Sequence, residues 1–224
     1  MCKTFVNLKK MIQKLWLLFA FISNIGFAQT YDFNLVTIYT NSREGISTDR
    51  IVFSNTDNQT YFMSIANNSD KNVAYLVDIK NSKNHYMSYV KEMVDGETSF
   101  EFSYNKTTPV EQVALTNDNY FEFETIQEDS IYKTIRMTCV KKKKKKSDTS
   151  ITLIKVKKIK YNLFPIFRFS HLHLFEYRED VDLNENGIVE SAESLNYPKN
   201  TCKLTYFKDV NFKVYIPNNK KLRL

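Results

Sequence analysis

The sequence predicts a mainly β protein: an antiparallel meander or incomplete barrel of eight to ten strands, with one short helix near the C-terminal third. Apolar and polar residues alternate with a period of two along much of the chain, as in strands with one buried face. Tyr and Phe number 14 and 17, and aromatic residues favour strands. Only 4 glycines are present, so clusters rich in Asn and Asp are expected to form the turns.

The first 28 residues predict a secretory signal peptide rather than part of the fold. A leader with four lysines and no acid comes before an apolar run at residues 15–28. Gly26 and Ala28 supply the small residues that a signal peptidase requires, and the run is short for a membrane span. We therefore expect residues 1–28 to be removed and residues 29–224 to form one β-rich domain. Its expected location is the periplasm or cell envelope, or outside the cell.

The strands are predicted from runs that alternate or are apolar in both phases. These runs are residues 31–40, 60–65, 72–80, 99–104, 120–125 and 210–216. Residues 31–40 and 72–80 are apolar in both phases, as expected of central strands covered on both faces. The helix is predicted at residues 170–181, with Ser170 as its N-cap and one apolar face.

Two cysteines, Cys139 and Cys202, remain after removal of the leader. Each is in phase with apolar residues of an alternating run, so both side chains are expected to face the core. In an exported chain they either form one disulfide or remain two buried thiols. The sequence leaves both alternatives open.

The stretch from Asp182 to Glu193 has oxygen donors at alternate positions around Gly187. The candidate ligands are Asp182, Asn184, Asn186, Ile188 through its carbonyl, Glu190 through water, and Glu193. Calcium takes six to eight oxygens, so a chain curling around the ion presents alternate residues to it. The spacing resembles the calcium loop of EF-hand proteins. This resemblance implies one calcium ion, a bend at Gly187, and closure by both carboxylate oxygens of Glu193.

Residues 141–160 hold ten lysines against a single acid, Asp148. Neither interleaved aromatic residues nor a recognition motif accompanies this tract, so no nucleic-acid partner is expected. Two interpretations remain. The tract is either a solvated loop leading into a strand, or a surface attracted to an anionic membrane or polysaccharide.

No serine-hydrolase, zinc-protease or phosphate-loop motif is present, and we do not expect an enzyme. The leader ending in GFAQ, the Lys-, Asn- and Tyr-rich β domain and the late LFPIF and EYRED segments resemble uncharacterised Sec-exported β-rich envelope proteins of Bacteroidota. The resemblance implies an envelope location. We therefore expect an exported, non-enzymatic envelope protein with a structural calcium loop and a binding or structural role. The alternative is a periplasmic carrier of an apolar ligand or lipid on a curved, aromatic-lined sheet.

Overall fold

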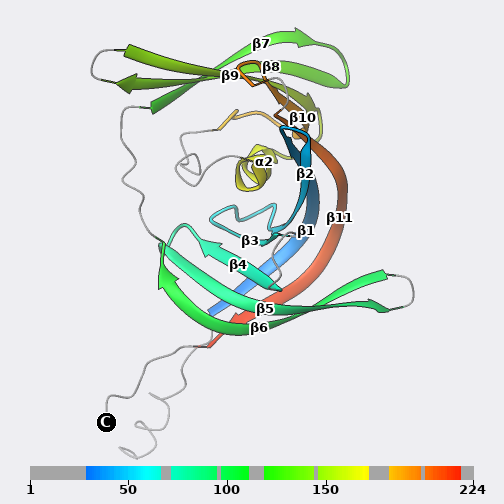
Figure 1. Ribbon diagram of the computed structural model, residues 1–224. Helices are drawn as coiled ribbons and strands as arrows, with labels where there is room; N and C mark the ends of the chain where they lie inside the picture. Colours follow the sequence, from blue (N-terminus) through cyan, green and yellow to red (C-terminus); the bar gives the residue numbers. More distant parts are fainter. Residues whose placement is uncertain are drawn as a thin grey trace, which may run out of the picture. The chain divides into compact units, whose positions relative to one another are not determined.

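Eleven strands form one open sheet over the residues that the computed structural model describes, and a single helix accompanies them (Figure 1). The described residues are 29–66, 72–94, 97–110, 119–143, 146–171, 182–197 and 200–217. The strands are β1 (Gln29–Arg43), β2 (Ile46–Ser54), β3 (Tyr61–Ala66), β4 (Val73–Asp78), β5 (Lys83–Val94), β6 (Glu97–Pro109), β7 (Asn119–Glu128), β8 (Tyr132–Lys143), β9 (Lys146–Lys157), β10 (Ile188–Ser194) and β11 (Thr201–Ile216). The helix is α2 (Phe164–His171).

The strand order is β6-β5-β4-β3-β2-β1-β11-β10-β9-β8-β7. Neighbours in the sheet are therefore neighbours in sequence, except where β1 lies beside β11. The predicted class, a mainly β antiparallel meander with one short helix, is confirmed, with eleven strands in place of eight to ten. Residues 1–28 lie outside the described residues, so the predicted leader and its boundary stay predictions. No helix of the described residues is long and apolar enough to cross a membrane.

The chain divides into two compact units. One is residues 32–212, and the other holds the described ends, residues 29–31 and 213–217. The helix, the candidate site and the core cluster below all lie in residues 32–212.

A two-residue turn joins β1 to β2, with Glu44 at φ 52° and Gly45 at φ 87°. Positive φ at both central residues is the geometry that suits the right-handed twist of a hairpin. The register Arg43↔Ile46 fixes which faces of the two strands are buried.

The hydrophobic core lies between strands β1–β4 and strands β7–β11, with α2 inside it (Figure 1). The phenylalanines of α2 contact both groups of strands. Phe169 stacks on Phe62 of β3 with ring centroids 4.2 Å apart, and Phe164 meets Phe123 of β7 edge to face at 5.7 Å. Burying an aromatic side chain contributes roughly 2–3 kcal/mol, so α2 is a main source of stability.

The predicted helix, residues 170–181, overlaps the described helix only at Ser170 and His171. The helix of the structure is α2, residues 164–171, and residues 172–181 lie outside the described residues. Ser170 is in the last turn of α2, where its Oγ donates to the Ile166 carbonyl at 2.8 Å. Asn162 precedes the helix, and its Oδ1 accepts the Phe164 N–H at 3.0 Å. Every residue from Phe164 to Ser170 is buried, so no amphipathic period marks this helix in the sequence.

The alternating runs at residues 99–104, 120–125 and 210–216 face as predicted, whereas residues 61–65 are buried on both faces. Phe121 and Phe123 are half-buried while Glu122 and Glu124 are exposed. The lysine run that was interpreted as a loop belongs instead to a hairpin. Residues 141–143 complete β8, and Lys146, which begins β9, pairs with Lys143.

Cys139 and Cys202, the two cysteines among the described residues, are buried thiols without a disulfide. Burial raises the pKa of the Cys202 thiol well above its ordinary value. The structure therefore favours the alternative of two inert thiols.

Candidate functional site

Two backbone hydrogen bonds join the segment before β10 to the segment before α2. The Gly187 N–H donates to the Tyr161 carbonyl at 2.8 Å, and the Leu163 N–H donates to the Gly187 carbonyl at 2.9 Å. These two bonds form an isolated parallel bridge between Asn162 and Gly187. The bridge fixes the last part of the predicted calcium loop against the start of the helix.

Asp182 is held by the same asparagine that precedes α2. The Nδ2 of Asn162 donates to both Asp182 carboxylate oxygens, at 3.0 and 3.2 Å. The Asn184 N–H also points at Asp182 Oδ1, at 3.4 Å, and Asn184 has a left-handed φ of 52°. Asn tolerates this conformation better than most residues. The chain therefore curls around the Asp182 carboxylate, as the first half of a calcium loop requires.

Gly187 does not have the role predicted for it. The residue with positive φ in this loop is Asn184, and Gly45 is the only glycine of the described residues with positive φ. A Cβ built on Gly187 would lie 2.4 Å from Val156 Cγ1 and 3.2 Å from the Lys157 carbonyl oxygen. Glycine is required here because the loop packs directly against β9.

The second half of the predicted loop is an extended strand. Ile188 begins β10, which runs to Ser194. Glu193 is exposed and lies opposite Leu153 of β9 and Thr201 of β11. At roughly 3.3 Å per residue, about 17 Å separate the Cα atoms of Ile188 and Glu193.

Glu190 is the extra residue of a β-bulge. Val189 pairs with Val156 and Ser191 with Lys155, so Glu190 has no partner residue in β9. Its Oε2 lies 2.9 Å from Lys155 Nζ, and its Oε1 accepts the Tyr132 hydroxyl at 3.2 Å. The hydrogen bond from Lys155 lowers the pKa of Glu190, and the same bond raises the pKa of Lys155.

The six predicted ligands therefore fall into separate groups. Asp182 and Asn184 are in contact, and Asn186 follows them on the exposed part of the loop. Ile188 is buried at the start of β10. Glu190 is engaged by β8 and β9, and Glu193 lies further along β10.

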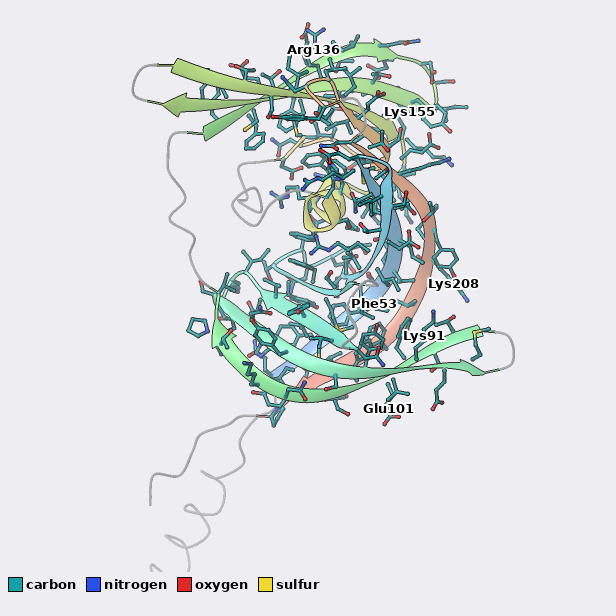
Figure 2. All side chains as sticks on the ribbon, viewed as in Figure 1. Phe53, Lys91, Glu101, Arg136, Lys155 and Lys208 are labelled. Atoms are coloured by element: carbon teal, nitrogen blue, oxygen red, sulfur yellow. The ribbon has the colours of Figure 1, made fainter. Side chains whose placement is uncertain are left out.

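Lysines in β8 and just after β9 form ion pairs with acidic residues near this loop. Lys133 Nζ lies 2.6 Å from Glu185 Oε2, and Lys158 Nζ lies 2.7 Å from Glu128 Oε1. The bond to Glu185 raises the pKa of Lys133, and the bond from Lys158 lowers that of Glu128. Lys155 and Lys158 belong to the basic tract, so part of its charge is already balanced. Figure 2 shows Lys155 and Arg136 on the side of the sheet away from α2.

Sequence reasoning missed a pocket beside Glu190. It measures about 330 Å³ and is lined by Lys157, Ile188, Glu190, Leu204, Tyr206 and Phe207, among others. One feature of the sequence indicated this pocket. Tyr206 and Phe207 are adjacent in an alternating strand, so one of the two aromatic rings must lie on the polar face.

Comparisons with protein-family models, with curated proteins and with solved structures find no match to this chain.

Proposed function

We propose that this is an exported, non-enzymatic protein of the cell envelope in which one structural calcium ion stabilises the loop before β10. The observation that carries the proposal is the fixed position of Asp182. Asn162 donates to both of its carboxylate oxygens and also caps the start of α2. A calcium ion at Asp182 would therefore tie the helix to β10 through one short loop.

The proposed ligands are the side-chain oxygens of Asp182, Asn184 and Asn186 and the carbonyl oxygen of Ile188, with water completing the shell. Glu190 is left out because Lys155 and Tyr132 already hold its carboxylate. Glu193 would reach the loop only if β10 left its ladder with β9. A site with one carboxylate binds weakly, so we expect a dissociation constant of about 10⁻⁴ to 10⁻³ M, the range of extracellular modules.

The export part of the proposal is supported by the basic and apolar leader, and the non-enzymatic part by the absence of a catalytic motif in the sequence. The carrier alternative receives less support. Phe164, Phe167 and Phe169 of α2 fill the space between the two groups of strands, where an apolar ligand was expected. Binding of residues 141–160 to an anionic surface stays a prediction. Lys155 and Lys158 contribute little to it because they form ion pairs with Glu190 and Glu128.

The test is thermal unfolding of the purified protein in chelator and in calcium. At a dissociation constant of about 0.1 mM, roughly 5 mM calcium adds about 2.3 kcal/mol of stability. For a chain of this length that raises Tm by roughly 5–9 °C. Asp182→Ala should abolish the rise, while Asp57→Ala, at an exposed aspartate of another loop, should keep it.

A calorimetric titration with calcium gives a second readout that does not depend on unfolding. Heat of binding that is present in the unsubstituted protein and in Asp57→Ala, and absent in Asp182→Ala, is the expected result. An unsubstituted protein with neither a calcium-dependent Tm nor a heat of binding would refute the calcium site.

A further inference from the structure

The pocket beside Glu190 exists because β10 and β11 separate. Their described pairing runs from Glu193↔Thr201 to Ser191↔Lys203 and goes no further. The bulge at Glu190 lies directly before this last pair, and bulges commonly end pairing and redirect a side chain. The opening between the strands holds the pocket of about 330 Å³.

One wall of the pocket is polar and is formed by the Glu190 carboxylate. Two hydrogen bonds fix the orientation of this carboxylate, and Lys155 balances its charge. The Glu190 side chain is 32% exposed, and Lys155 and Tyr132 hold one oxygen each. A carboxylate offers about four acceptor sites, so both oxygens retain capacity for hydroxyl donors. Lys157, also in the lining, adds an ammonium donor. The hydroxyl groups of a ligand can donate hydrogen bonds to the carboxylate and accept them from the ammonium.

The other wall is aromatic and exposed. Tyr206 is 44% and Phe207 is 53% exposed, and the buried side chain of Ile188 forms part of the base. Aromatic faces provide rigid apolar contact area, which favours flat ligands with an apolar face.

Three ligand classes fit this combination poorly. A wholly apolar ligand would desolvate the Glu190 carboxylate without giving it a hydrogen bond. A cation would meet Lys157, and an anion would meet the carboxylate oxygens of Glu190. A neutral ring with hydroxyls at its rim and C–H groups on its face avoids all three penalties. The volume, near the lower limit of about 300 Å³ for ligand sites, suits a single ring.

We propose that this pocket binds one neutral sugar ring of a glycan, with the ring against Phe207, which shares the face of Lys155 and Lys157, and its hydroxyls on Glu190 and Lys157. The site goes beyond the calcium loop and shares only Ile188 with it, because its other lining residues belong to β9, β10 and β11.

The experiment follows the backbone amide signals of the purified protein by NMR, in chelator, during sugar titration. Glucose, galactose, mannose and N-acetylglucosamine are each added to about 10 mM, ten times the dissociation constant of roughly 1 mM expected of a shallow one-ring site. Choline chloride and sodium phosphate are the cationic and anionic comparison probes. At least one sugar should shift the signals of residues 188–190 and 204–207, and choline and phosphate should not.

Two aromatic variants give the matched comparison. Phe207→Ala should weaken sugar binding about tenfold, as expected from the loss of the ring face that the sugar contacts, and Tyr206→Ala, in phase with the core-facing Cys202, should weaken it less. Tyr197→Ala removes a tyrosine that is 64% exposed and outside the pocket, and it should leave the affinity unchanged. All three side chains are exposed, so the variants should fold. Absence of a shift with every sugar, a shift with choline or phosphate instead, or equal affinities in all three variants would overturn the proposal.

Discussion

Gly187→Ala tests whether close packing of the loop against β9 holds the site together. The new Cβ would lie 2.4 Å from Val156 Cγ1, closer than real Cβ contacts come, and 3.2 Å from the Lys157 carbonyl oxygen, tighter than most. The Val156 side chain, the loop or β9 must therefore move. Gly187 also makes the two backbone bonds to Tyr161 and Leu163, and a shift of the loop strains both.

Forcing one methyl group into a packed interior costs about 1–3 kcal/mol, and each weakened hydrogen bond about 1 kcal/mol. We expect Gly187→Ala to lower the free energy of unfolding by about 3 kcal/mol. At 2–4 °C per kcal/mol for a chain of this length, Tm falls by roughly 6–12 °C. Unfolding on heating would be followed by circular dichroism at 218 nm, where β-strands give a negative signal.

Gly45→Ala is the matched control, because it also replaces a glycine by alanine. Gly45 has φ 87° and nothing within 4 Å of a built Cβ, so only backbone strain of about 1 kcal/mol is expected there. A second variant, Val156→Ala with Gly187→Ala, removes the clashing Cγ1 and should lose less stability than the two single changes added together. A double variant that is additive within about 0.5 kcal/mol, or a Gly187→Ala as mild as Gly45→Ala, would refute the packing argument.

Two further predictions concern the strands around the site. Tyr39→Phe removes the buried hydroxyl that donates to the Val189 carbonyl at 2.7 Å, and should reduce stability to urea by about 1–3 kcal/mol; an unchanged midpoint would contradict this. The bond from Lys155 lowers the pKa of Glu190, so this pair stabilises the fold above the ordinary glutamate value of about 4.3 and loses its effect as pH falls through the folded-state pKa. Glu190→Gln should therefore flatten the dependence of Tm on pH below about 4.3 and leave it unchanged near neutral pH. A mutant with the same acid slope would argue against that role.

The fold class was predictable because alternation is a local property of the chain. Phe121 and Glu122 point to opposite faces in any strand, and the sheet uses that difference directly. The helix was not predictable by the same reasoning. Its residues from Phe164 to Ser170 are buried on every side, so the sequence lacks the polar face that identifies a surface helix. The amphipathic pattern of residues 170–181 predicted a helix that begins in the last turn of α2, and residues 172–181 lie outside the described residues.

Local patterns do not encode that β1 lies beside β11, or which residues pair across the long connection between β9 and β10. Lys155 meets Ser191, 36 positions later, and this pairing places the bulge at Glu190. The lysine tract illustrates the same limit. Its composition indicated a basic surface, but the neighbours that balance Lys155 and Lys158 come from β10 and from the end of β7.

Only the first half of the stretch from Asp182 to Glu193 has the curl that the spacing predicted, for a physical reason. Spacing along the chain identifies ligands only if the backbone curls, since alternate residues converge on a curl and diverge on a strand. Asn184 adopts a left-handed conformation, and the chain at Asp182 does curl. From Ile188 onward the backbone is paired with β9, so it is extended and Glu190 faces other partners. Glu190 therefore belongs by geometry with Tyr206 and Phe207, and the same carboxylate that the spacing assigned to calcium forms the polar wall of the pocket.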